Sequence, residues 1–245
     1  MDWADFISGW KKLAQARGFQ IEVMLERDGL EILGCNRESA NENAPWIYTS
    51  SGVHGDEPAG PQALMRLLEE DFFDDRANWL VCPVLNPTGL VAGTRTNKDG
   101  DDLNRDYKTK KTPEVQGHLK WLDQQPNAVL FLSLHEDWES TGFYYYEINL
   151  EVEGPSYEEF VAAAAPFFPP EPEPVIDDHE TRKKGWIYHE DKPDVEDGWP
   201  EAIYLAKKNC TLSFTFEMPS SKGLEARIEC HKALVKTAVE KLKPC

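Results

Sequence analysis

The sequence predicts an α/β fold, and three features of the chain support that prediction. Short apolar runs typical of buried strands lie at residues 46–48, 79–85 and 128–134, and the last is the most continuously apolar stretch of all. An amphipathic run at 62–68 follows the first of these strands after a turn, as expected where a strand leads into a helix. The chain has 245 residues, enough for a full hydrophobic core. We therefore expect residues 1–245 to form one α/β domain.

The first elements should be a helix and a strand pair. Residues 1–18 carry apolar side chains at helical spacing, and these are Trp3, Phe6, Ile7, Trp10 and Leu13. This pattern predicts an amphipathic surface helix, whereas a secretion signal would need a basic start and an unbroken apolar core. Residues 20–24 and 31–33 then alternate, with the hairpin turn Asp28-Gly29 between them.

Five further strands and helices are predicted, in chain order. The strand at 79–85 ends at Asn86-Pro87-Thr88-Gly89, which is a turn by composition. Residues 113–123 predict a helix and residues 143–147 a strand, whose three tyrosines are left out of any site because alternation alone does not say which one faces a pocket. Residues 212–216 alternate as another strand, and a long helix should begin near Leu224.

One segment, around residues 166–200, is expected to be an insert. Residues 166–174 contain too many prolines for a helix or a central strand. Residues 175–200 place Trp186, Tyr188 and Trp199 among many charged residues. We expect this insert to be a rigid excursion that covers the mouth of a cleft and contributes to substrate choice.

Charge and cysteine content exclude several classes of function. The formal charge is −18 and the isoelectric point is near 4.7, which argues against nucleic acid and anionic membranes as partners. No run approaches the length of a membrane span, so we expect a cytoplasmic protein. The five cysteines, at 35, 82, 210, 230 and 245, form no CxxC pair and suggest neither a disulfide framework nor a cysteine-ligated zinc.

A metal site is predicted at the turn over residues 51–60. His54 and Glu57 are three residues apart in this turn, so that an imidazole and a carboxylate can bind one ion. A catalytic zinc needs three protein ligands and an open position. His135 follows the apolar run at 128–134, and ligands in α/β sheets bind at the carboxyl ends of the strands. We expect His54, Glu57 and His135 to meet there.

The loop after the strand at 79–85 carries Arg95, Asn104 and Arg105. Such residues in a loop often make only caps and surface ion pairs. Beside a metal site, however, they supply the planar donors that hold a carboxylate and stabilise an oxyanion.

Taken together, five motifs resemble those of the zinc metallocarboxypeptidases of the carboxypeptidase A type. They occur in family order between residues 46 and 220 and are His54-Gly-Asp-Glu57, Asn86-Pro87-Thr88-Gly89 with Arg95, Asp102-Leu103-Asn104-Arg105, Ser133-Leu134-His135 and Ser213-Phe214-Thr215-Phe216-Glu217. The resemblance implies an open, mixed, eight-stranded sheet flanked by helices, with one Zn²⁺ ion at its carboxyl edge.

The resemblance also implies a role for each site residue. His54, Glu57 and His135 would be the zinc ligands, and Glu217 the general base and acid. Arg95 would polarise the scissile carbonyl. The substrate-binding residues would be Asn104 and Arg105, which hold a free carboxylate, and Tyr204, which matches the family's mobile tyrosine. The position of Glu217 after the run 212–216 agrees with its role, since its carboxylate would emerge at a strand end.

These motifs leave the substrate open. The leading expectation is a zinc metallopeptidase that removes the C-terminal residue of a peptide by metal-activated water. In its length and in the sequence around Arg95 and Asn104, the chain most resembles the small bacterial members of the family, which include murein-peptide amidases. One alternative is an amidohydrolase of the succinylglutamate desuccinylase and aspartoacylase branch, which deacylates N-acyl amino acids. Another is a silent peptide-binding module. The motifs specify no oligomeric state.

The other titratable residues are not expected to be ligands. His118 and His231 lie in predicted helices and should be packing or surface residues. His179 and His189 flank the charged part of the insert, but their separation matches no metal-ligand pattern. Transition ions other than zinc would fit the same ligand set, and Glu136 or Asp137 could support a second ion.

Overall fold

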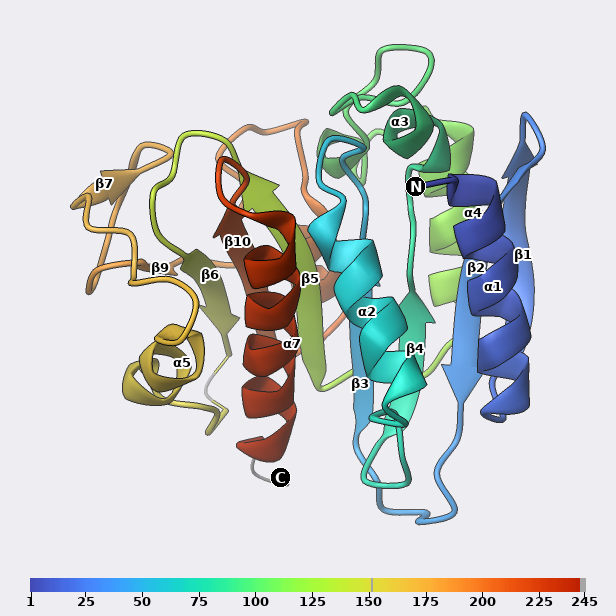
Figure 1. The fold of residues 1–245 in the computed structure, drawn as a ribbon, viewed down its shortest axis with the longest axis horizontal. Coiled ribbons are helices and arrows are strands. Elements are labelled where there is room, and N and C mark those ends of the chain that lie inside the picture. Colours follow the sequence, from blue (N-terminus) through green and yellow to red (C-terminus); the bar gives the residue numbers. More distant parts are fainter. Residues whose placement is uncertain (151, 243–245) are drawn as a thin grey trace.

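An eight-stranded sheet runs through the computed structural model of the protein, which describes residues 1–150 and 152–242 (Figure 1). The strands are β1 (Gln20–Arg27), β2 (Leu30–Arg37), β3 (Trp46–Ser51), β4 (Asn78–Cys82), β5 (Leu130–Asp137), β6 (Tyr144–Asn149), β9 (Trp186–Tyr188) and β10 (Leu212–Pro219). Their order across the sheet is β1-β2-β4-β3-β5-β10-β6-β9. The central run from β4 to β10 is parallel, while β1, β2 and β6 are antiparallel to their neighbours nearer the centre. The predicted open mixed sheet is confirmed.

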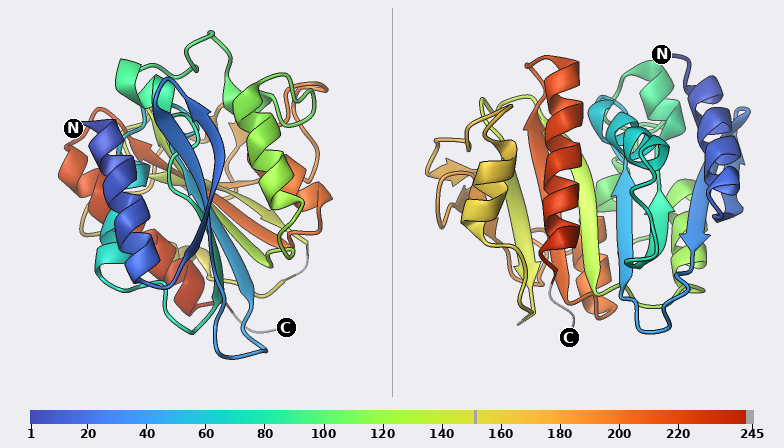
Figure 2. Two further views of the ribbon diagram at one scale, coloured as in Figure 1. Left: turned by 90° about the vertical axis from the view of Figure 1, so that its right-hand side faces the viewer. Right: turned by 60° about the horizontal axis from the view of Figure 1, so that its bottom comes forward.

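Helices cover both faces of this sheet (Figure 2). The helices are α1 (Trp3–Ala16), α2 (Ala59–Glu69), α3 (Pro87–Ala92), α4 (Pro113–Leu122), α5 (Tyr157–Ala164), α6 (Glu201–Lys207) and α7 (Leu224–Glu240). Helices α1, α2, α5 and α7 lie on one face, and α4 and α6 lie on the other. A short hairpin of β7 (Val175–Ile176) and β8 (His179–Glu180) stands apart from the main sheet.

Alternation along β5 explains both the apolar run and the site that follows it. Leu130, Leu132 and Leu134 belong to the core under α1, α2 and α7, whereas Phe131 belongs to the core on the opposite face. A strand buried on both faces is nearly continuously apolar, and the small side chain of Ser133 is the one polar group in the run at 128–134. Successive side chains point to opposite faces, so His135 shares the face of Phe131.

The same alternation continues in the two strands beside β5. On β10, Phe214 and Phe216 enter the first core, so Glu217 faces the opposite side of the sheet. On β6, Tyr145 enters the first core, which leaves Tyr144 and Tyr146 on the side of Glu217. Part of this second face of the sheet therefore carries polar side chains, and these are not packed under a helix.

Most element predictions are confirmed, with boundary shifts. The first helix, the hairpin at Asp28-Gly29, the helix from residue 113 and the C-terminal helix from Leu224 are all present. The predicted strand at 79–85 is shorter and ends at Cys82. The described cysteines are free and buried, and Cys245 lies outside the described residues. Across residues 1–150 and 152–242, no helix is long and apolar enough to cross a membrane.

The segment Asn86-Pro87-Thr88-Gly89 differs from the prediction. It begins helix α3 rather than forming only a turn. Asn86 is the N-cap, and its Oδ1 accepts a hydrogen bond of 2.9 Å from the backbone N–H of Gly89. Proline at the first helical position loses no hydrogen bond there. Turn and cap residues are the same types, which is why composition alone did not separate them.

Residues 166–174 form no helix and no central strand, as predicted, and the rest of the insert to residue 200 is not helical either. It supplies the edge strand β9, which pairs with β6, and the β7–β8 hairpin. Tyr146 on β6 touches this insert, because its hydroxyl donates a 2.7 Å hydrogen bond to Asp177. The insert is thus attached to the polar face of the sheet.

Candidate metal centre

The turn that carries His54 is shaped by close backbone contact. Gly52 has φ of +61°, a conformation that favours glycine. A Cβ atom on Gly55 would lie 1.9 Å from the carbonyl carbon of Gly89 at the start of α3. Only glycine fits at position 55 without moving that helix, so this contact fixes how the turn sits against α3.

His54, Glu57 and His135 come together as predicted. All three are buried, and their potential ligand atoms lie within 4.8 Å of one another. Nδ1 of His54 is 2.6 Å from Oε1 of Glu57, and Nδ1 of His135 is 2.9 Å from Oε2 of the same carboxylate. Glu57 therefore stands between the two imidazoles.

The hydrogen bonding of these groups calls for a cation. Nε2 of His54 lies 3.3 Å from Oδ1 of Asp102, which accepts the proton on that nitrogen. Nδ1 of the same ring lies against the carboxylate of Glu57, so His54 stands between two carboxylates, and a second proton or a metal ion on Nδ1 would match this contact. Nδ1 of His135 and Oε2 of Glu57 are at ion-pair distance but lack hydrogen-bond geometry and have no other partner. A metal ion would satisfy all of these atoms, and two imidazoles with one carboxylate suit zinc.

The charges at this site follow from its burial and its neighbours. Burial opposes the charged form of His54, yet the carboxylates of Glu57 and Asp102 raise its pKa to about 9. Burial likewise opposes ionisation of Glu57, but His54 and His135 lower the pKa of that carboxyl to about 2. Burial lowers the pKa of His135. Glu57 is thus an anion available to a cation.

Asp102 links the ligands to Arg95. Its second oxygen accepts a 3.0 Å hydrogen bond from Nε of Arg95, whose Nη1 lies 3.9 Å from Oε1 of Glu57. The amide of Asn86 donates to the backbone carbonyl of Arg95. The guanidinium is half-exposed and faces the cavity. Asp102 was part of a recognised motif, but no role was predicted for it.

Asn104 and Arg105 lie on a 3₁₀ turn, Leu103–Arg105, beside Asp102. Asn104 is buried, and its Oδ1 accepts a 3.0 Å hydrogen bond from the backbone N–H of Glu201 at the start of α6. Arg105 is exposed and donates to the carbonyl of Asn104. Both side chains line the same cavity as the three candidate ligands.

That cavity has a volume of about 530 Å³. Its floor is the polar sheet face of β5, β10 and β6, and its rim includes the insert. The lining residues that bear on chemistry are His54, Glu57, Arg95, Asn104, Arg105, His135, Tyr144, Tyr146, Asp177, His179, His189, Asp194 and Glu217. A cavity of this size fits a small ligand or a short peptide end.

Glu217 lies next to His135, because β10 and β5 are parallel neighbours with these two residues in register. Burial raises the pKa of Glu217 well above its usual range, and the charges of Glu57, Asp137 and Asp177 raise it further. Arg95 opposes this shift. A carboxyl with raised proton affinity beside candidate metal ligands is suited to proton transfer.

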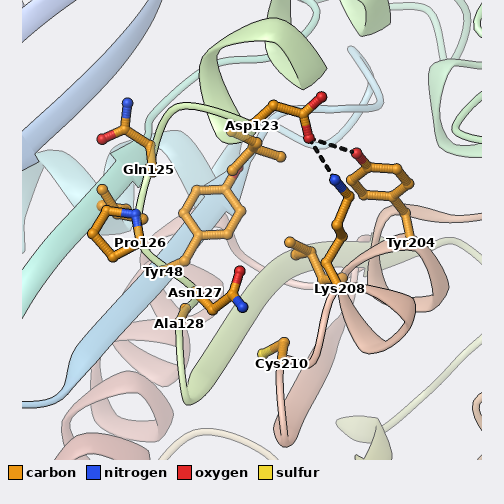
Figure 3. Close-up of a pocket in the computed structure, with 12 residues that line it drawn as sticks. Tyr48, Asp123, Gln125, Pro126, Asn127, Ala128, Tyr204, Lys208 and Cys210 are labelled. Carbon is orange, nitrogen blue, oxygen red and sulfur yellow. Dashed lines mark hydrogen bonds and ion pairs between the residues drawn. The ribbon is translucent and has the colours of Figure 1, made fainter.

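Tyr204 is not brought to this cavity. It lies on α6 and lines a separate pocket of about 80 Å³, where its hydroxyl donates to Asp123, which also binds Lys208 (Figure 3). This pocket includes residues 126–128, just before β5 begins, and so lies at the amino ends of the strands. Tyr144 lies on β6 in register with Glu217 on β10, and it lines the main cavity instead.

The other histidines are accounted for as follows. His118 is fully buried between the hydroxyls of Tyr48 and Tyr107, at 2.8 and 2.9 Å. His231 is fully buried in α7, and neither ring nitrogen has a partner among the described residues. Both fit the expectation of packing residues. His179 and His189 were not expected to be ligands, yet they lie together with Asp194.

Glu136 is not free to bind a second ion. Its Oε1 accepts a hydrogen bond of 2.5 Å from the N–H of Ala59, at the start of α2. Its other oxygen pairs with the guanidinium of Arg227. Both oxygens are thus engaged in joining β5 to α2 and α7, so of the two residues that could support a second ion, Glu136 is already occupied.

Comparison with known proteins agrees with this fold. The family model of the succinylglutamate desuccinylase/aspartoacylase catalytic domain matches residues 43–158, just under half of the chain. No curated protein sequence matches. A provisionally named metallopeptidase from Shewanella amazonensis SB2B has a TM-score of 0.85 at 23% identity, covering 100% of this chain and 94% of that one.

Two further structures are similar over most of this chain. A metallo-carboxypeptidase from Pseudomonas aeruginosa, in complex with (2-guanidinoethylmercapto)succinic acid, has a TM-score of 0.65 at 17% identity and covers 95% of this chain and 68% of that one. The product-bound cell shape determinant protein Csd4 from Helicobacter pylori has a TM-score of 0.60 at 17% identity, with 87% and 56% covered. At these identities the likeness is one of fold, and it agrees with the fold that the motif resemblance implied.

Proposed function

We propose that this protein is a zinc-dependent metallocarboxypeptidase, which hydrolyses the C-terminal amide bond of a peptide. The observation that carries the proposal is a convergence of side chains. Three candidate metal ligands, the carboxyl of Glu217 and two arginines surround one cavity at the carboxyl ends of the parallel strands. A lone histidine cluster would support metal binding alone, but the added acid–base group and anion donors support catalysis.

The metal would be held by Nδ1 of His54, the carboxylate of Glu57 and Nδ1 of His135. When bound, a zinc ion supplies Lewis acidity and lowers the pKa of water. Asp102 orients His54 through Nε2, and such outer contacts fix the ring and its tautomer.

Glu217 would act as base and then as acid. It would take a proton from the attacking water and give it to the leaving amine nitrogen, for which its raised pKa is suitable. Arg95, beside Glu57, would stabilise the negative charge that develops on the carbonyl oxygen. Asn104 and Arg105 would hold the free carboxylate of the substrate, because an exposed guanidinium forms paired hydrogen bonds with carboxylates.

The substrate we favour is a peptide with a free C-terminal carboxylate, and a murein peptide is one candidate. The cavity volume of about 530 Å³ and the open rim accommodate a peptide end. The many acidic residues of the chain disfavour acidic substrates at long range, although Arg95 and Arg105 make one wall locally positive.

A second candidate function is hydrolysis of N-acyl amino acids. The match of residues 43–158 to the succinylglutamate desuccinylase/aspartoacylase catalytic domain supports it. Both reactions would use the same metal ligands and carboxylate donors, so the two differ in what fills the rest of the cavity.

A substrate panel would separate the two functions. It should contain unblocked peptides, the same peptides with C-terminal amides, N-acyl amino acids and a murein tripeptide. Release of the C-terminal residue from unblocked peptides, with little cleavage of N-acyl amino acids, is the expected result. Cleavage of N-acyl amino acids alone would favour the second function, and no turnover at all would favour a binding role.

A further inference from the structure

We propose that the chain has a second metal site, formed by His179, His189 and Asp194 on the rim of the cavity. It would bind a transition-metal ion of the Zn²⁺ class. His179 lies on β8, His189 directly follows β9, and Asp194 lies in the loop after it. This set shares no residue with the first candidate site and does not depend on the proposed reaction.

The spacing of the three side chains suits a tetrahedral ion. Nε2 of His189 lies 3.2 and 3.3 Å from the two carboxylate oxygens of Asp194, and Nε2 of His179 lies 3.5 Å from one of them. Metal bonds of about 2.0–2.1 Å at tetrahedral angles place ligand atoms about 3.3 Å apart. An ion could therefore enter between these atoms with little movement.

The orientation of His189 directs one ring nitrogen at the carboxylate of Asp194 in a way that suits a metal ligand. Its Nδ1 is 2.6 Å from the backbone carbonyl of Glu190, which can only accept a hydrogen bond. The proton of a neutral ring must then sit on Nδ1, so that Nε2 presents a lone pair to the carboxylate of Asp194. Two lone pairs face each other unless a metal ion or a second proton lies between them. A carbonyl partner on the far ring nitrogen is also typical of histidines that bind metal.

The surroundings favour a cation as well. Among the described residues, no lysine or arginine pairs with Asp194, whose ion-pair partners are the two imidazoles. The ring of Tyr146 packs against both imidazoles, with centroids 5.7 and 6.2 Å away, and holds them in place. Its hydroxyl is bound to another carboxylate, that of Asp177.

Two imidazoles and a carboxylate select the kind of ion. Calcium and magnesium prefer oxygen ligands, whereas zinc, cobalt and nickel bind imidazole. His179 and His189 are largely buried, but Asp194 is 64% exposed. Three protein ligands on an open rim leave a coordination position free toward the cavity.

Metal content tests the proposal directly. The wild-type protein would be equilibrated with Zn²⁺, desalted and analysed by mass spectrometry for zinc per chain, together with His189→Ala, Asp194→Asn and His54→Ala. Glu190→Gln is the matched control, because it removes the same charge from an exposed neighbour of His189. We expect about two ions in the wild type and in the control, and about one in each of the other three variants. The double variant His54→Ala/His189→Ala should hold none.

A second measurement uses the unaltered chain, in case a variant does not fold. Diethyl pyrocarbonate acylates unliganded imidazoles, and the modified residues can be located by mass spectrometry. Zn²⁺ should protect His179 and His189 from acylation. A zinc content that is the same in wild type, His189→Ala and Asp194→Asn, or equal labelling of both histidines with and without Zn²⁺, would overturn the proposal and leave a protonated imidazole pair on Asp194. Loss of zinc only in His54→Ala would uphold the first site and reject the second.

Discussion

At the scale of single residues, one substitution distinguishes the proposed role of Glu217 in proton transfer from the role of the metal ligands. Glu217→Gln removes the proton acceptor while leaving His54, Glu57 and His135 in place. We expect zinc at the first site to be retained and kcat to fall by about 10²–10⁴-fold or more, the usual contribution of a general acid–base group. Steady-state kinetics on metal-loaded protein would measure this. Near-normal turnover in the loaded variant would refute the role of Glu217.

His135→Ala should have the opposite pattern. It removes one of three ligands and leaves the carboxylate of Glu57 with His54 alone, so the first site should lose its ion. The measurement is zinc per chain in the His189→Ala background, which isolates the first site from the second. Full zinc occupancy in that double variant would remove His135 from the ligand set.

Glu201 gives a prediction for pH. It is buried on α6, where Tyr48 and Ser50 donate hydrogen bonds of 2.8 and 2.7 Å to its carboxylate and His118 lies 3.7 Å away. Burial raises the pKa of Glu201 to about 7, although those hydrogen bonds oppose the shift. Burial lowers the pKa of His118 to about 3, so that ring stays neutral over the same range.

The direction of the pH dependence of stability follows because the pKa of Glu201 is higher in the folded protein than in the unfolded chain. The folded protein favours the protonated carboxyl of Glu201. The stabilisation that this carboxyl contributes to folding is therefore fully present below about pH 4.5 and is lost as the pH rises through about 7. Glu201→Gln should therefore gain stability relative to wild type between pH 5 and pH 8, by up to roughly 3 kcal/mol. Denaturant unfolding at both pH values would test this. A difference between the two proteins that does not change with pH would contradict it.

At the scale of elements, the contact between the ligand turn and α3 depends on Gly55. Gly55→Ala would place a methyl group against Gly89 and force α3 away from the turn. We expect a loss of more than about 2 kcal/mol of stability, with weaker zinc binding, because backbone cannot yield as a side chain can. Gly9→Ala on α1 is the control, since its Cβ would meet no atom within 4 Å and alanine favours a helix by about 1 kcal/mol. Equal unfolding free energies for the two variants would argue against a steric role for Gly55.

Sequence patterns predicted residues that lie close together in the chain or at the end of one strand, but not the pairing of the strands. His54 and Glu57 could be predicted because they are three positions apart in one turn, and His135 because it continues the apolar run of β5. The eight-stranded mixed sheet came from family resemblance, but the order of its strands was not predicted, because no pattern in the chain states which strand pairs with which. Tyr144 and Tyr146 could be assigned to the cavity only after β10 and β9 were placed on either side of β6.

The second cluster was missed for a related reason. His179 and His189 are ten positions apart, with Asp194 further on, and no local geometry joins residues at that spacing. They meet because β8 and the end of β9 both approach Tyr146. Tyr204 shows the opposite case, in which a motif match was available but α6 directs the side chain to the far end of the strands.

At the scale of the whole molecule, the arrangement of layers explains where chemistry is possible. Helices α1, α2, α5 and α7 cover one face of the sheet and α4 and α6 lie on the other (Figure 2), where a cavity is lined by residues of β5, β10 and β6. Parallel strands β3, β5 and β10 end beside that cavity and supply the turn of His54, His135 and Glu217. Part of the segment at 166–200 lines the rim of the cavity and brings His179 and His189 to it.

The most direct test of the central claim is release of a C-terminal residue from an unblocked peptide, measured with zinc, with a chelator, and after zinc is restored. We expect cleavage that the chelator abolishes and zinc recovers. We expect little cleavage of the same peptide when its C-terminus is an amide, because Asn104 and Arg105 would lose the carboxylate that they are proposed to bind. Cleavage that persists in the chelator, or that proceeds equally on the amidated peptide, would contradict a metal-dependent carboxypeptidase built on these residues.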